Sequence, residues 1–219
     1  MRICISLSRN KELIPFNYQQ LLTGVIHKWL GKNNKEHGKN SLYSFSWLQN
    51  TLKEGNGLRL KQNSYFFISA YDTELIKKIM KGILESPDVF CGSKAIDIQF
   101  IDIPQFSNEE SFFLSSPVLI RKKDGENTKH VTYLDDDFES LLTENLKSKL
   151  QSANINSDGV SVELDKNYPS PETKLVTYKG ISNKTSLAPL IIKGTSNQIA
   201  FAWSVGLGHS TGIGFGALK

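Results

Sequence analysis

Four histidines are the side chains of this chain best suited to acid–base chemistry. The ordinary pKa of histidine, about 6.5, lets its imidazole take or give a proton near neutral pH. His27 and His37 are close in sequence, so one could act as general base and the other as general acid at one site. His130 lies in the polar stretch RKKDGENTKHVTY, which we expect to be a solvated hairpin. His209 lies in a glycine-rich stretch.

His27 falls on the polar side of a predicted helix that begins after Asn17, the expected N-cap. Two glycines share that side with it, although each is unfavourable in a helix by about 1 kcal/mol relative to alanine. The strip is Gln20, Gly24, His27 and Gly31, opposite an apolar arc of Leu21, Leu22, Val25, Ile26, Trp29 and Leu30. Close approach of a ligand would explain so bare a strip. Packing of another part of the chain against it is the alternative.

His37 follows this helix in the polar stretch GKNNKEHGKNS, which also carries Lys39. A solvated loop is the simplest interpretation. Because the loop leaves the end of the helix that bears His27, however, two histidines and a lysine could converge on one anionic group. The lysine would then stabilise negative charge while the histidines move protons.

Five glycines crowd the end of the sequence, SVGLGHSTGIGFGALK. The stretch lacks the third glycine of a dinucleotide fingerprint and no crossover helix can follow it, and no G-K-[ST] of a phosphate-binding P-loop occurs. Glycines that allow positive φ could still direct N–H groups at an anion, with His209 and Ser210 as further donors. Tight turns and close packing are the alternative. We favour the ligand, bound by Gly206, Gly208, His209, Ser210, Gly212, Gly214 and Gly216.

Arg121, Lys122 and Lys123 end a predicted strand and could bind phosphates or simply keep an edge soluble. The net charge is only +4, and we expect no strongly basic tail. Cys4 and Cys91 are too few for a disulfide framework or a zinc site, and the acidic run at 135–137 is most simply a helix N-terminus. We therefore expect no metal and no cofactor. Without a long apolar segment or a signal peptide, we expect a cytoplasmic protein.

The elements that must position these residues occur in one order twice. In the first half the sequence predicts the order β-α-β-β-α-β. Its elements are a strand at 1–8, the helix after Asn17, strands at 42–48 and 64–71, a helix capped by Thr73 and a strand at 95–103. After the polar stretch 104–111, the order returns. It consists of the strand FFLSSPVLIRKK, a helix from 135–137, the strands GVSVELD, KLVTYKG and APLIIKG, the helix NQIAFAWSVG and the short strand IGFGALK. We expect an α+β fold of two tandem ferredoxin-like (RRM-like) domains, 1–108 and 109–219.

These segments carry a resemblance to a known family. GLGHSTGIGFG resembles the C-terminal glycine-rich motif of the CRISPR-associated repeat-processing endoribonucleases, which belong to the RAMP superfamily of tandem ferredoxin-like proteins. The glycine motif is specific only to the superfamily. The match is narrowed by PFNYQQLLTGVIHKWL, which is similar to the family's first helix, and by FFLSSPVLIRKK, similar to the opening of its second domain. LVTYKGI and APLIIKG resemble the strands before its last helix.

The resemblance implies CRISPR repeat RNA as the partner and metal-independent cleavage by the 2′-hydroxyl, leaving a 2′,3′-cyclic phosphate. It also implies roles: His37 as general base, His27 as general acid, with the two exchangeable, and Lys39 as electrostatic stabiliser. A monomer or homodimer that contacts subunits of a CRISPR effector complex fits this family. One alternative is a non-catalytic RNA-binding subunit of such a complex, and another is a ferredoxin-like module that binds only protein.

Overall fold

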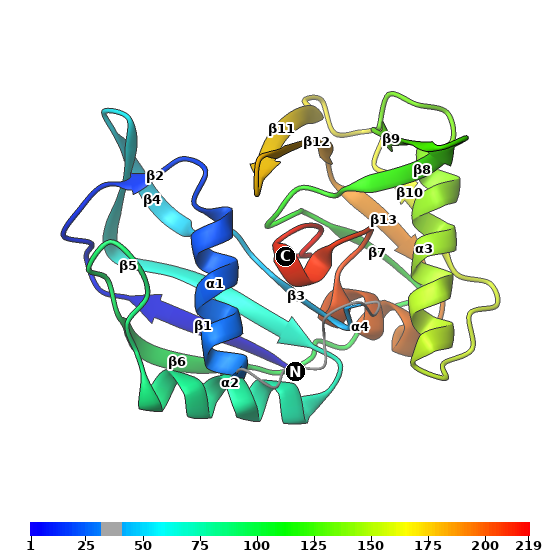
Figure 1. The fold of residues 1–219 in the computed structure, drawn as a ribbon. Coiled ribbons are helices and arrows are strands. Elements are labelled where there is room, and N and C mark those ends of the chain that lie inside the picture. The colour runs from blue at the N-terminus through cyan, green and yellow to red at the C-terminus, as the bar shows by residue number, and fades with distance from the viewer. Residues whose placement is uncertain (32–40) are drawn as a thin grey trace.

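The computed structural model describes residues 1–31 and 41–219 and contains two α+β units side by side (Figure 1). The first unit carries an antiparallel sheet with two helices against one face. Its elements are β1 (Arg2–Leu7), β2 (Ile14–Pro15), α1 (Gln19–Leu30), β3 (Tyr43–Phe45), β4 (Gln49–Glu54), β5 (Gly57–Ala70), α2 (Thr73–Glu85) and β6 (Ala95–Ile101).

The order of strands in this sheet is the order of a ferredoxin-like fold. β1 lies between β5 and β6, and β2, β3 and β4 pair with the far side of β5. Ile3, Ile5 and Leu7 alternate along β1 and are buried, because the same face of the sheet is covered by α1 and α2. The period-two pattern of the sequence therefore predicted both the strand and its buried face.

The second unit repeats that order with two inserted hairpins. Its elements are β7 (Glu109–Phe112), β8 (Ile120–Asp124), β9 (Asn127–Val131), α3 (Phe138–Ser152), β10 (Ser161–Leu164), β11 (Glu172–Tyr178), β12 (Ile181–Leu187), β13 (Leu190–Lys193) and α4 (Ser196–Val205). The sheet runs β10-β13-β7, and a bridge between Leu114 and Leu218 adds the end of the chain beside β7. The pairs β8-β9 and β11-β12 form separate hairpins.

Several local expectations were wrong in detail. The N-cap of α1 is Tyr18, with no side-chain bond, and the cap of α2 is Asp72, which accepts from the N–H of Glu74. The segment 112–123 is broken into the end of β7 and the start of β8, and β12 was missed. The last segment forms a 3₁₀ turn at Thr211–Ile213 and a single bridge, because its glycines take turn conformations. The expected domain boundary near residue 108 stays a prediction.

Arg2 joins the two units. Its guanidinium lies 3.9 Å from the ring centre of Phe67 and 3.6 Å from that of Trp203, so it is stacked between a ring of β5 and a ring of α4. It donates to Ser69 Oγ in β5 and to the carbonyl oxygens of Trp203 and Leu218 in the second unit. The side chain is buried, and burial lowers the pKa of Arg2 to about 9. Within the described ranges, no helix is long and apolar enough to span a membrane.

We expect Arg2→Lys to lower the free energy of unfolding by about 2–4 kcal/mol, because an ammonium can neither stack flat between two rings nor reach all three acceptors. Urea unfolding measures the change. Arg9→Lys is the matched control, since Arg9 is exposed on the loop after β1. Equal stabilities of the two variants would contradict the role given to Arg2.

Candidate functional site

His27 lies in the last turn of α1 and is half-buried. The helix forms because Leu22, Ile26 and Trp29 share its buried face, whereas Leu21, expected on that face, is 41% exposed. Gly24 is exposed, and a Cβ added there would meet no atom of the described residues within 4 Å. The expected alternative, packing of the second unit against the strip, is therefore not found at Gly24 among residues 1–31 and 41–219.

The other predicted catalytic residues, His37 and Lys39, lie outside the described residues. The two described ends of their segment are Gly31, which ends α1 with φ at 85°, and Ser41. Ser41 is in contact with the glycine-rich loop of residues 206–216: Thr211 Oγ1 donates to its carbonyl oxygen at 3.3 Å. The segment between them therefore follows the end of α1 and precedes a residue that contacts the second unit.

The glycines of the loop pack against backbone and rings at close range. An added Cβ would lie 2.6 Å from the carbonyl oxygen of Gly216 at Gly206, 2.7 Å from that of Leu119 at Gly208, and 2.7 Å from the ring of Phe45 at Gly214. These three glycines also have positive φ, where other residues are strained. The close packing that the sequence left as the alternative is present. Binding of RNA by this loop stays a prediction.

Three side chains of the first unit hold the loop by its carbonyl oxygens. Gln19 Nε2 donates to Ile213 at 2.6 Å, the Tyr43 hydroxyl to Gly212 at 3.0 Å, and Trp47 Nε1 to Gly214 at 3.0 Å. The backbone N–H groups of Leu207, His209, Ile213, Gly214 and Gly216 donate to carbonyl oxygens of the protein. An anion at this loop would therefore have to be bound by groups other than these five N–H groups.

A cationic cluster lies beside the loop. The N–H of Arg121 donates to His209 Nδ1 at 3.2 Å, so that imidazole carries its proton on Nε2. Arg121 Nη2 donates to Ser210 Oγ, and its buried Nε has no partner among the described residues. His130 pairs with Arg121 across the β8-β9 hairpin. Burial, followed by the charge of Arg121, lowers the pKa of both histidines.

The three predicted basic residues of β8 differ in their surroundings. Lys122 forms an ion pair with Asp137 at 2.5 Å, which raises its pKa, and Lys123 is exposed. Arg121 has no ion pair within the part of the chain that the structure describes, and burial lowers its pKa. Arg121 is thus a partly buried cation whose counter-charge is missing, which favours it over its neighbours as an anion ligand.

Lys149 was not singled out from the sequence. It projects from α3 into the protein and donates to the carbonyl oxygen of Gly206 at 3.0 Å, beneath the glycine-rich loop. Burial lowers its pKa to about 7. The signal was available, because Lys149 continues the buried stripe of Leu142 and Leu146 at helical spacing.

Because the pKa of Lys149 is below the ordinary 10.5, the unfolded chain binds more protons than the folded chain between about pH 7 and 10.5, and stability rises with pH there. We expect the advantage of the wild type over Lys149→Met to grow by about 2 kcal/mol between pH 7 and pH 9. Denaturant unfolding at several pH values measures this. Lys147→Met, from the same helix, is the control, and parallel pH profiles for all three proteins would refute the expectation.

No group of three or more His, Cys, Asp or Glu side chains able to hold a metal ion occurs in residues 1–31 and 41–219. Cys4 and Cys91 are free thiols, and burial raises the pKa of each.

Comparison with known proteins places these features in a family context. Residues 101–219 match the family model described as CRISPR associated protein Cas6, C-terminal. A protein of Pyrococcus furiosus, named as a CRISPR-associated endoribonuclease-like protein Cas6, is 26% identical and is aligned over 100% of this chain and 98% of its own length.

Solved structures of other proteins superpose on the whole length of this chain. The product of a Cas6-related gene from Pyrococcus furiosus superposes with a TM-score of 0.85 at 23% identity, covering 100% of this chain and 97% of its own. A structure described as an RAMP protein binding different RNA substrates gives 0.85 at 20% identity, with 100% and 98% covered. These likenesses confirm the expected α+β fold of tandem ferredoxin-like units.

Proposed function

This chain belongs to the CRISPR-associated Cas6 family, and on that premise we propose that it is a metal-independent endoribonuclease that cuts the repeats of a CRISPR transcript into guide RNAs. The family relation supports repeat RNA processing in general. The observation that carries the catalytic proposal is the exposed position of Gly24 on the side of α1 that bears His27, close in sequence to the segment with His37.

In the proposed reaction His37 takes the proton from the 2′-hydroxyl beside the scissile phosphate. The 2′-oxygen then attacks phosphorus, and His27 gives a proton to the departing 5′-oxygen, with the two roles exchangeable. Lys39 stabilises the extra negative charge on the phosphorane. The products are a 2′,3′-cyclic phosphate and a 5′-hydroxyl, and no metal or cofactor takes part.

RNA binding is supported by the cationic cluster beside the glycine-rich loop. Arg121 lacks a counter-charge, and His209 and Ser210 are its direct partners, so one phosphate could satisfy the buried Nε of Arg121. Lys122, Lys123 and the loop glycines complete the proposed contact surface. We place this reaction in the cytoplasm, carried out by a monomer or homodimer that passes its product to an effector complex.

We expect His27→Ala and His37→Ala each to slow single-turnover cleavage of the host repeat RNA by about 10²–10⁴-fold in excess EDTA, because each removes one proton transfer. Affinity for the RNA should change little. Arg9→Ala is the control, since Arg9 is exposed on the loop after β1 and belongs to neither proposed site. A 2′-deoxy substitution at the cut should also abolish cleavage.

Undiminished cleavage by the His27→Ala, His37→Ala double variant would exclude these residues as catalysts. Tight binding of wild-type protein to RNA without any cut would instead favour the non-catalytic RNA-binding subunit.

We expect Arg121→Gln to weaken RNA binding and to reduce the slope of log affinity against log salt by about 0.7–0.9, the change for one lost phosphate contact. Lys122→Gln is the matched control, because Lys122 is already paired with Asp137 and should reduce the slope less. Fluorescence anisotropy over a salt series measures both. A larger effect at Lys122 than at Arg121 would reverse the assignment.

A further inference from the structure

Lys149 reaches the glycine-rich loop from the last turn of α3, and it is a buried cation that the proposed reaction does not use. Its ammonium Nζ donates to the carbonyl oxygen of Gly206 at 3.0 Å and to Thr211 Oγ1 at 3.5 Å. In the sequence these two acceptors stand before and after His209 and Ser210. Lys149 therefore holds both ends of the short stretch that carries the partners of the cationic cluster.

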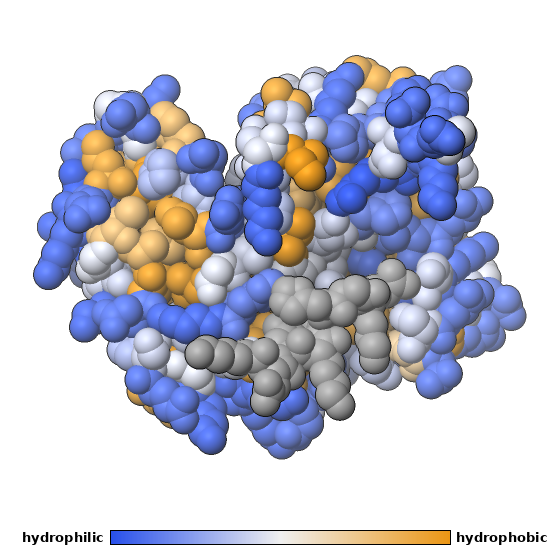
Figure 2. Space-filling view, viewed as in Figure 1, coloured by the Kyte–Doolittle hydropathy of each residue, from blue (hydrophilic) through white to orange (hydrophobic). Residues whose placement is uncertain are grey.

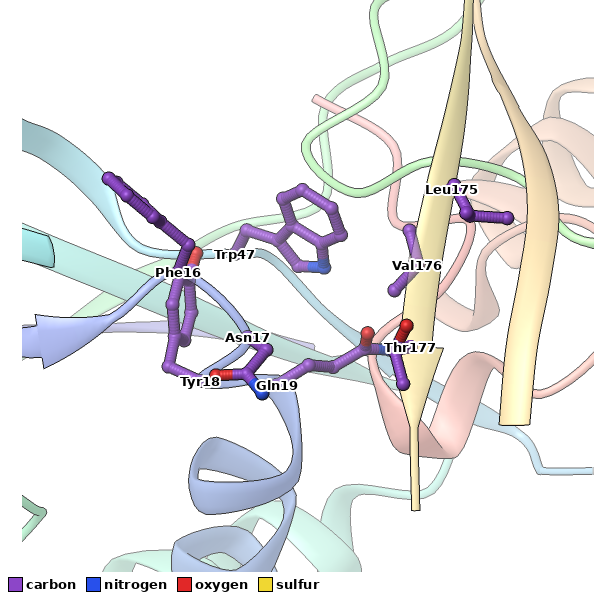
Figure 3. Close-up of a pocket in the computed structure, with 8 residues that line it drawn as sticks. All are labelled: Phe16, Asn17, Tyr18, Gln19, Trp47, Leu175, Val176 and Thr177. Atoms are coloured by element: carbon purple, nitrogen blue, oxygen red, sulfur yellow. The ribbon is translucent and has the colours of Figure 1, made fainter. Parts of the chain in front are cut away.

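The rest of the loop is held from the first unit. A cleft divides the two units on the face shown in Figure 2, and the red end of the chain in Figure 1 runs between them. Gln19 and Trp47, which also line the pocket in Figure 3, donate to the carbonyl oxygens of Ile213 and Gly214. These bonds reach the end of the loop, whereas Lys149 holds the carbonyl group at its start.

We propose that Lys149 is a positioning residue for RNA binding: its charged form holds the loop and adds positive charge beneath the phosphate that Arg121 binds, so that RNA binding is accompanied by the uptake of a proton at Lys149. The inference rests on the proposed function, which supplies the phosphate. Because the side chain is buried beneath the loop, Lys149 acts through the loop and through its charge rather than by touching the RNA.

The charged and titratable groups near Lys149 come from several elements. Arg121 of β8 contacts the loop, His209 belongs to it, and Tyr43 of β3 donates to its backbone. α4 has no charged or titratable side chain, and the carboxylate of β10, Glu163, is already in an ion pair. Positive charge therefore gathers at this part of the loop.

That charge is not balanced by a carboxylate. Neither Arg121 nor Lys149 forms an ion pair within residues 1–31 and 41–219. Burial lowers the pKa of His209, and the charges of Arg121 and Lys149 lower it further. A phosphate bound at Arg121 would offset the positive charge and so stabilise the ammonium form of Lys149.

The direction of the pH dependence follows from this linkage. In the free protein burial lowers the pKa of Lys149 to about 7, so its proton is lost as the pH rises above that value. A bound phosphate raises this pKa, and the complex therefore keeps the proton to higher pH. RNA affinity should be greatest below pH 7 and should fall as the pH rises through the pKa of the complex.

The test measures the affinity of the protein for host repeat RNA made uncleavable by a 2′-deoxy substitution, by fluorescence anisotropy from pH 6 to pH 9. We expect the affinity of the wild type to fall about tenfold for each unit by which the RNA raises the pKa of Lys149. Calorimetry at pH 8 in two buffers of different ionisation enthalpy should show the uptake of roughly half a proton per RNA.

Two variants of Lys149 separate its charge from its packing. Lys149→Met should take up no proton and should bind more weakly than the wild type at pH 6, where the wild type is charged. Lys149→Arg stays charged at every pH used, so its affinity should change little with pH. Lys147→Met, from the same helix, is the matched control, and His209→Gln should keep the fall above pH 7, because the pKa of His209 is lower.

Equal proton uptake by the wild type and Lys149→Arg would overturn the inference, and so would a wild-type affinity that does not change between pH 6 and pH 9. If the wild type still cleaves the native repeat in either case, only the role of Lys149 fails. If the wild type neither binds nor cleaves the repeat RNA, the proposed function fails with it.

Discussion

The relative position of the two ferredoxin-like units depends on one stacked arginine. Arg2 is near the start of the chain and Trp203 is near its end. The Arg2 guanidinium lies between the rings of Phe67 and Trp203 and donates three hydrogen bonds, so it connects parts of the chain that are far apart in sequence. A buried guanidinium is stable only where its N–H groups are paired and its faces are covered, so the site admits little displacement of one unit against the other. The width of the cleft between the units follows from this constraint.

The glycine-rich loop is a second place where the two units meet. Together with the contacts of Arg2 it forms the seam between them. Gln19, Tyr43 and Trp47 bond its carbonyl oxygens from one side, and Lys149 bonds Gly206 from the other. Since the loop also contacts Ser41, the geometry of the seam is transmitted to the end of the segment that carries His37 and Lys39. The proposed anion-binding cluster and the described end of the segment that carries the proposed catalytic residues therefore share contacts with this loop.

Much of the fold could be predicted from the sequence, because strands and helices leave periodic patterns. Ile3, Ile5 and Leu7 specify β1 and its buried face, and the apolar residues of α2 specify its contact with the sheet. The contacts that matter most to the site are less visible, since they join residues about 200 positions apart. Arg2 reads as an ordinary polar position at a strand start, and Gln19 as an ordinary helix residue. For the glycines, the sequence showed that unusual backbone was needed but could not tell a ligand from a neighbouring chain segment as the cause.

Six of the side-chain hydrogen bonds described above have a common polarity: the side chain donates and a backbone carbonyl group accepts. Trp203, Leu218, Gly206, Gly212, Ile213 and Gly214 all take part through carbonyl oxygens. A carbonyl is present whatever the side chain, so substitutions on the accepting side are tolerated wherever the backbone path is kept. The contacts of the seam are then specified by a few donor side chains and by the glycines that set the backbone conformation of the loop. Such an architecture can keep its geometry while most of its sequence diverges.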